Sequence, residues 1–233
     1  MPAPRLWLIV PAAGIGQRMQ AEQPKQYLRI DQRFILDITL SRLMDSAPFS
    51  GCMVPLHPAD HWWPDTEASG DNRIQTCTGG SERAGSVLSA LHAMAEQISD
   101  DDWVLVHDAA RPCLHTRDLC NLIDQLYNHP VGGLLASPVA DTLKSAGTGE
   151  LPEVSGTVDR TNLWRALTPQ MFRYRILVES LEAALARELP VTDESSAVEF
   201  SGNIPVLVEG RPDNIKITVP ADLALAGFIL SRF

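Results

Sequence analysis

Short apolar runs alternate with helical patterns along most of the chain. The apolar runs, each bounded by turn residues, are typical of buried strands and occupy residues 6–10, 53–56, 73–77, 103–107 and 133–137. Apolar residues recur at helical spacing in residues 87–98, 119–126 and 177–185. This alternation predicts an α/β fold, a Rossmann-like, mostly parallel sheet with helices on both faces. Ligands of such sheets bind beyond the carboxyl ends of the strands.

Residues 137–161 interrupt this alternation. They have little helical periodicity, are rich in Gly, Ser, Thr and Pro, and contain two short β-like pieces around a glycine turn. This composition predicts a β-hairpin arm that projects from a single domain of residues 1–233. A lone hairpin is marginally stable in water, so we expect the arm to pack against something else, such as a second subunit.

Composition and charge restrict the class of protein. Apolar residues make up 45% of the 233 residues and charged residues 21%, an ordinary globular balance. The formal net charge of −10 argues against a general nucleic-acid binder, and no apolar stretch approaches the ~20 residues that span a bilayer. The four cysteines lack metal-ligand spacing, and no basic segment precedes the first apolar run, which predicts a cytoplasmic protein with reduced thiols. If this acidic protein binds an anion, its few cations must be concentrated at the site.

The first apolar run leads into a glycine-rich turn, PAAGIGQRM, residues 11–19. A dinucleotide fingerprint needs a third glycine where this chain has Met19, and a P-loop needs Lys and Ser or Thr after Gly16, where this chain has Gln and Arg. A loop of small residues with free backbone N–H groups, followed by Arg18 and Lys25, suits the phosphates of a nucleoside triphosphate. The alternative is a tight turn between strand and helix with cations on the surface.

Two further segments favour the same chemistry. Residues 77–87, CTGGSERAGSV, form a second glycine-rich loop that leads into a helix. Residues 103–112 are an apolar strand that ends at Asp108 and is followed by small residues and Arg111. A carboxylate at the end of a strand beside a phosphate site is a natural Mg²⁺ ligand, because Mg²⁺ takes one or two carboxylates together with substrate phosphates. Taken alone, Asp108 would more often be a turn or cap residue.

A set of motifs occurs together and in one order: VPAAGIGQRM, PKQY, GGSERAGSV, VHDAARP, TVDR, ALTPQMF, TDESSAVE and VEGRPDNIKIT. With this set the chain resembles the 2-C-methyl-D-erythritol 4-phosphate cytidylyltransferase family of the non-mevalonate isoprenoid pathway over residues 8–225. The resemblance implies a homodimer that uses Mg²⁺ or another divalent cation. It would transfer CMP from CTP to 2-C-methyl-D-erythritol 4-phosphate, giving 4-diphosphocytidyl-2-C-methyl-D-erythritol and pyrophosphate. Because a phosphate oxygen attacks the α-phosphorus in line, the protein's task is placement and charge neutralisation.

The resemblance also implies a nucleotide site. Arg18 and Lys25 would stabilise the transition state, Asp108 would hold the metal, and Lys216 would bridge the phosphates and position the attacking oxygen. The residues that line the nucleotide would be Pro11, Ala12, Ala13, Gly14, Gly16, Gly80, Ser81, Ser86 and Ala109. We expect a structural role for His107, since the attacking phosphate oxygen is already anionic near neutral pH and proton removal gains little.

The acceptor site implied by the resemblance involves the arm. Thr142 and Arg160, on or beside the projecting hairpin, would bind the methylerythritol phosphate of the neighbouring subunit, and Arg160 would join Arg18, Lys25 and Lys216 as a catalytic residue. Further candidates for this pocket are Arg111, Thr168 and Thr192.

Three alternatives remain open. A ribitol-5-phosphate cytidylyltransferase would share the CTP site and differ in its acceptor pocket. A non-catalytic nucleotide-binding domain would not need Arg18, Lys25, Asp108 and Lys216 together. A dehydrogenase would bind NAD(P)H at the first glycine loop, a reading that Met19 weakens.

Overall fold

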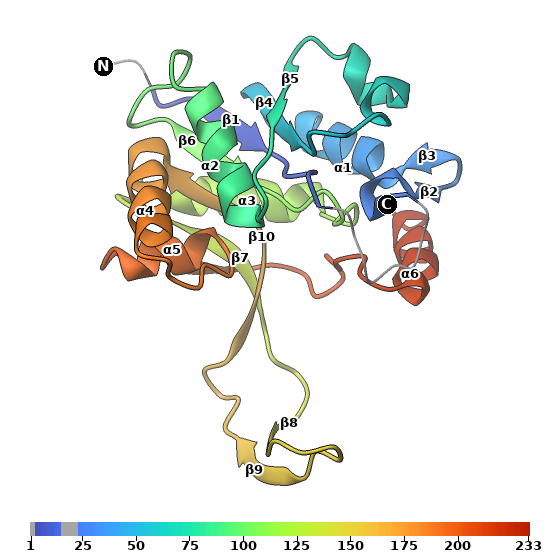
Figure 1. The fold of residues 1–233 in the computed structure, drawn as a ribbon, viewed down its shortest axis with the longest axis vertical. Coiled ribbons are helices and arrows are strands. Elements are labelled where there is room, and N and C mark those ends of the chain that lie inside the picture. The colour runs from blue at the N-terminus through green and yellow to red at the C-terminus, as the bar shows by residue number, and fades with distance from the viewer. Residues whose placement is uncertain (1–2, 15–22) are drawn as a thin grey trace.

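The computed structural model describes residues 3–14 and 23–233. A seven-stranded sheet in the order β11-β7-β10-β6-β1-β4-β5 forms the centre of this part of the chain (Figure 1). Strand β10 is antiparallel to both of its neighbours, and the other pairings are parallel, which confirms the mostly parallel sheet. The strands are β1 (Leu6–Ile9), β4 (Phe49–Leu56), β5 (Ile74–Thr78), β6 (Trp103–Val106), β7 (Gly132–Pro138), β10 (Trp164–Arg173) and β11 (Val206–Glu209).

Helices cover both faces of the sheet (Figure 1). In β1, Leu6 and Leu8 point into one core, and Trp7 and Ile9 point into the other, because successive side chains of a strand face opposite ways. The first core is covered by α1 (Ile35–Met44) and α3 (Thr116–Leu126), and the second by α2 (Arg83–Ala93), α4 (Tyr174–Ala186) and α5 (Glu194–Phe200). None of the helices in the described ranges is long and apolar enough to cross a membrane.

The helix expected at 87–98 differs from the observed one. Helix α2 begins earlier, at Arg83, and ends at Ala93, after which the chain continues in turns. Met94 and Ile98 nevertheless stay buried in the same core as the helix. The apolar periodicity therefore marked burial correctly beyond the point where the helix ends.

The hairpin expected within residues 137–161 is present as the antiparallel pair β8 (Leu143–Ala146) and β9 (Val154–Val158). It lies at the end of a long projection that continues from β7 and β10 of the main sheet (Figure 1). Its tip exposes apolar side chains, since Leu151 is 83% exposed and Val154 is 67% exposed.

Small elements surround the carboxyl ends of β1 and β4. The 3-10 helix η2 (Lys25–Tyr27) precedes the two-stranded pair β2 (Arg29–Ile30) and β3 (Arg33–Phe34). The 3-10 helices η3 (Trp63–Asp65) and η4 (Glu67–Gly70) follow β4. Helix α6 (Pro220–Leu230) shares a small apolar core with Ile30 of β2. The Trp62 ring stacks on the Tyr27 ring, with 5.6 Å between the ring centroids, so η2 is held against the segment after β4.

Candidate active site

A cavity of about 180 Å³ opens where β1 and β6 end. Ile9 pairs with Val106 in parallel register, so the loops that follow these two strands begin side by side. The residues expected at the site that line this cavity are Pro11, Ala12, Ala13, Gly14, Lys25, Gly80, Ser81, Ser86, Asp108, Ala109 and Lys216. The fold therefore brings together residues from five separate segments of the chain.

Close packing between the two glycine loops, and within the second of them, requires glycine at two positions. A Cβ atom on Gly79 would lie 2.6 Å from the Cβ of Ala13, and one on Gly80 would lie 2.9 Å from the backbone of Gly85. The Ser86 hydroxyl accepts a hydrogen bond from the Gly80 N–H at 3.1 Å, which fixes the second loop at the start of α2. Ser86 therefore lines the cavity and also holds the loop in place.

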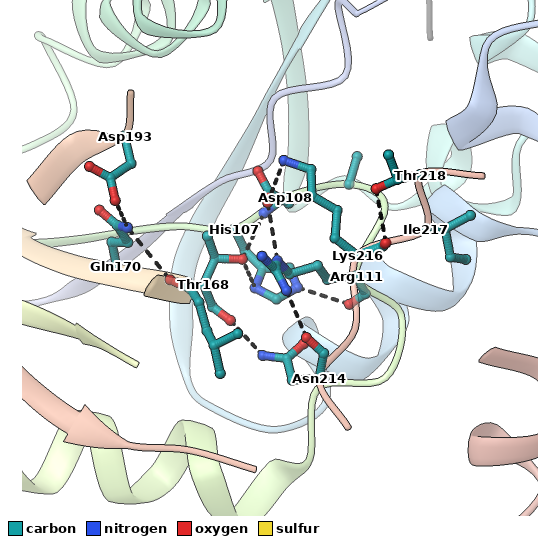
Figure 2. A network of polar contacts seen from close by, with 12 residues as sticks. His107, Asp108, Arg111, Thr168, Gln170, Asp193, Asn214, Lys216, Ile217 and Thr218 are labelled. Atoms are coloured by element: carbon teal, nitrogen blue, oxygen red, sulfur yellow. Dashed lines mark hydrogen bonds and ion pairs between the residues drawn. The ribbon is translucent and has the colours of Figure 1, made fainter. Parts of the chain in front are cut away.

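Asp108 is the centre of a cluster of cations. Its Oδ1 lies 3.1 Å from Arg83 Nε. Its Oδ2 lies 3.1 Å from Arg111 Nε and 2.9 Å from Lys216 Nζ (Figure 2). Burial alone would raise the pKa of Asp108, but the charges of Arg83, Lys216 and Arg111 outweigh it, and its pKa lies well below the ordinary value. The carboxylate is therefore ionised throughout the physiological pH range.

Arg83 and Glu194 are parts of this cluster to which the sequence patterns assigned no role. Arg83 also donates through Nη1 to the carboxylate of Glu194, a residue that is only 1% exposed. The guanidinium thus lies between two carboxylates, which fixes its direction at the cavity wall. These partners are 111 residues apart in the chain, and no local pattern links them.

A second layer of hydrogen bonds holds the backbone at Asp108 (Figure 2). The Asp108 N–H donates to Thr168 Oγ1 at 3.1 Å, and the Thr168 hydroxyl lies 3.1 Å from His107 Nδ1. His107 Nε2 lies 3.0 Å from the Arg111 carbonyl oxygen. Because a carbonyl oxygen only accepts, Nε2 carries the proton. Burial lowers the pKa of His107, so the ring is neutral near pH 7 and Nδ1 accepts from the Thr168 hydroxyl. Asn214 Nδ2 donates to the Thr168 carbonyl at 2.7 Å and completes the layer.

Two residues of this layer, His107 and Thr168, do not line the cavity. His107 is fully buried and bonded to protein groups on both ring nitrogens, in agreement with a structural role. Thr168 is 4% exposed, and its hydroxyl is bonded to the Asp108 N–H and to His107 Nδ1. Its assignment to the acceptor pocket remains a prediction.

Stability should depend on pH through His107. Burial lowers the pKa of His107 to about 4, below the value of about 6.5 for an exposed histidine. Between these values the unfolded chain binds the proton and the folded chain does not, so the free energy of unfolding should fall as pH falls from about 6.5 to about 4. We expect the loss to be on the order of 3 kcal/mol, measured by urea unfolding of metal-free protein. His107→Gln should reduce this pH dependence, and an equal slope in both proteins would contradict the prediction.

The remaining expected residues are spread more widely. Gly16 and Arg18 lie outside the described residues. Thr142 and Arg160 are exposed on the arm and do not line the cavity, and Arg160 donates to the carbonyl oxygen of Ala140. Thr192 is exposed just before α5, where its N–H donates to a serine hydroxyl of the first turn. Within one chain, the arm residues are thus not part of the cavity lining.

Comparison with known proteins places the chain in a family. The family profile described as IspD, 2-C-methyl-D-erythritol 4-phosphate cytidylyltransferase, matches residues 6–232. The protein of that name from Hahella chejuensis is 49% identical over 228 residues, covering 98% of this chain and 94% of the relative. The one from Pseudomonas entomophila is 51% identical over 221 residues, covering 94% of this chain and 93% of the relative.

Solved structures agree with these relatives. A crystal structure of 4-diphosphocytidyl-2C-methyl-D-erythritol synthase superimposes with a TM-score of 0.85 at 34% identity, covering 99% of this chain and 100% of the other. The Francisella tularensis 2-C-methyl-D-erythritol 4-phosphate cytidylyltransferase gives a TM-score of 0.83 at 35% identity, covering 97% and 99%. The agreement of motifs, sheet topology and full-length similarity shows that the chain belongs to the 2-C-methyl-D-erythritol 4-phosphate cytidylyltransferase family.

Proposed function

We propose that this protein is a cytoplasmic enzyme that transfers CMP from CTP to 2-C-methyl-D-erythritol 4-phosphate. The products are 4-diphosphocytidyl-2-C-methyl-D-erythritol, an isoprenoid precursor, and pyrophosphate. The observation that carries the proposal is the convergence of Lys25, Lys216 and the Arg83–Asp108 pair on one cavity between two glycine loops. Cations and backbone amides gathered in this way are suited to bind a triphosphate within an acidic protein.

The reaction requires that the two substrates be held in line and that the charge of the transition state be stabilised. An oxygen of the acceptor phosphate forms a bond to the α-phosphorus of CTP, and the bond from that phosphorus to the oxygen of the leaving pyrophosphate breaks. Negative charge grows on the leaving group, and Lys25 and Lys216, which line the cavity, would stabilise it. No general base is required, because the acceptor phosphate is already anionic near neutral pH. His107 is fully buried and does not line the cavity, so it is not placed to act as one.

A divalent cation fits the chemistry of Asp108. Its carboxylate is ionised and lines the cavity, and the three cation contacts leave about one of its roughly four acceptor positions available. Mg²⁺ needs only one or two carboxylates when phosphates supply the other ligands. In the part of the chain that the structure describes, no group of three or more His, Cys, Asp and Glu side chains could hold a metal. We therefore propose Asp108 as the protein ligand of an ion that, when bound, neutralises triphosphate charge.

We propose a homodimer in which the arm of one subunit completes the acceptor site of the other. Support comes from the position of Thr142 and Arg160 on the exposed arm, outside the cavity of their own chain. The apolar side chains exposed at the tip of the arm, Leu151 and Val154, favour packing against another surface.

Arg160→Ala should raise KM for the acceptor by about 10- to 100-fold and leave the Kd for CTP within about twofold, because a charged hydrogen bond to the acceptor phosphate is lost. Steady-state kinetics with each substrate varied, together with calorimetry for CTP, would measure both. Lys144→Ala is the matched control, since Lys144 is also a cation of the arm but donates to Thr157 within it. Equal changes in the two constants would argue against an acceptor-specific role.

The proposed function is tested with the purified protein, CTP, Mg²⁺ and either polyol phosphate. We expect release of pyrophosphate and formation of the CDP-linked product with 2-C-methyl-D-erythritol 4-phosphate in preference to ribitol 5-phosphate. Preferential turnover of ribitol 5-phosphate would show that the acceptor is misassigned. No pyrophosphate with either acceptor would indicate a non-catalytic nucleotide-binding domain, and tight binding of NAD(P)H instead of CTP would indicate a dehydrogenase.

A further inference from the structure

The Gln26 side chain joins the turn that carries Lys25 to the first glycine loop. Its amide nitrogen donates to the carbonyl oxygens of Ala12, at 2.6 Å, and Gly14, at 3.2 Å. Gln26 is 3% exposed and yet contributes to the lining of the cavity. Both amide hydrogens are therefore used to hold the loop that is proposed to bind the triphosphate.

These bonds fix the direction of the loop's peptide groups. The carbonyl and N–H of one peptide unit point in opposite directions, so holding the Ala12 carbonyl on Gln26 turns the Ala13 N–H away from it. On its other side the loop is tied to β4, because the Ala12 N–H donates to the Pro55 carbonyl at 3.0 Å. Carbonyl oxygens repel phosphate, and N–H groups attract it. Gln26 occupies the two carbonyl oxygens that would otherwise be available to face an anion.

The turn that presents Gln26 is itself firmly anchored. Tyr27 is fully buried, its hydroxyl donates to Asp60 Oδ2 at 2.8 Å, and its ring stacks on Trp62. On the opposite side, Lys25 Nζ lies 3.3 Å from the Ile217 carbonyl oxygen, next to Lys216. The turn thus connects the glycine loop, through Gln26, to the segment that carries the second cavity lysine.

We propose that Gln26 is a positioning residue for the triphosphate. It holds the glycine loop of residues 11–14 at a fixed distance from the Lys25 turn, so that backbone amides and the Lys25 ammonium contact the same triphosphate. This inference rests on the proposed function, because it takes the ligand to be CTP. It assigns no contact with the reacting atoms to Gln26 itself.

Two variants of Gln26 separate positioning from packing. Gln26→Glu keeps the shape but directs a carboxylate, in place of an N–H donor, at two carbonyl oxygens, and Gln26→Met keeps the approximate volume with no polar group. The matched control is Gln23→Met, because the Gln23 amide donates at 3.0 Å to the Tyr27 carbonyl of the same turn and is not part of the cavity lining. The measurements are the Kd for CTP by calorimetry, kcat, KM for both substrates, and Tm.

We expect the Kd for CTP to rise about tenfold or more in Gln26→Met and further in Gln26→Glu, while KM for the acceptor changes less than about twofold. Gln23→Met should stay within about twofold of the wild type in the Kd for CTP. A purely structural role would lower Tm or the active fraction and leave the Kd of the folded protein unchanged, and that result in both Gln26 variants would overturn the inference. Failure of the wild type to bind CTP would overturn the proposed function as well, so the two failures are distinguishable.

Discussion

Asp108→Asn is expected to lower kcat by about 10²- to 10³-fold without weakening the binding of CTP measured in the absence of metal. The substitution removes the negative charge between Arg83, Arg111 and Lys216 and leaves these cations without their shared partner. The potential at the cavity becomes more positive, which favours the bound triphosphate. The proposed metal ligand is lost, and the cations lose the one carboxylate that orients them together, so that their arrangement matches the transition state less well.

Asp102→Asn is the matched control for this experiment. Asp102 is 4% exposed and bonded to the Arg5 guanidinium, but it precedes β6, whereas Asp108 follows the same strand. We expect Asp102→Asn to lower Tm and to leave kcat nearly unchanged for the folded protein. A kcat of Asp108→Asn within about threefold of the wild type would contradict the central role of this carboxylate.

Lys25→Ala is expected to lower kcat by about 10²- to 10³-fold and to change KM for CTP much less. The Lys25 side chain lines the cavity, and its ammonium is held near the Ile217 carbonyl. Charge that grows on pyrophosphate during the reaction interacts with this ammonium more strongly in the transition state than in the bound substrate, so the loss appears mainly in kcat. Pre-steady-state kinetics with saturating CTP would measure the chemical step directly, and an unchanged turnover would contradict the role.

The same variant tests whether sites are shared between subunits. Lys25→Ala and Arg160→Ala subunits that associate at random should recover about a quarter of the wild-type activity at low acceptor concentration, because half of the dimers are mixed and each contains one intact site. No recovery in verified mixed dimers would show that each site is built from one chain. The proposed arm contact would then be wrong, although the nucleotide site would be unaffected.

Much of the sheet could be predicted because buried strands are short apolar runs. The run at 103–107 corresponds to β6, and the run at 6–10 corresponds to β1. Strand β10 was missed because its first three residues are exposed and the polar residues Thr168 and Gln170 interrupt its buried part, so no continuous apolar run marks it. Strand β11 was missed as well, and two of its four residues are exposed, whereas β1 and β6 are buried along their whole length.

The candidate site was predictable where a residue type follows directly from a strand end. Asp108 follows β6, and the small residues of the first loop follow β1, so parallel register alone brings them together. The contacts of Arg83 with Glu194 and of Gln26 with the loop carbonyls could not be predicted in this way. They depend on side-chain direction and on distances between elements, which the spacing of residue types along the chain does not contain.

Strand β10 has a mechanical consequence for the whole enzyme. It begins at Trp164, where the arm meets the sheet, and four residues later Thr168 holds the backbone of Asp108. One continuous strand therefore connects the arm with Thr168, the residue bonded to the Asp108 backbone in the same chain. In a dimer of the kind proposed, any displacement of β10 caused by docking of the arm would reach the nucleotide cavity directly. Thermodynamic reciprocity would then require that CTP raise the affinity of the subunits for each other by the same factor by which association raises the affinity for CTP.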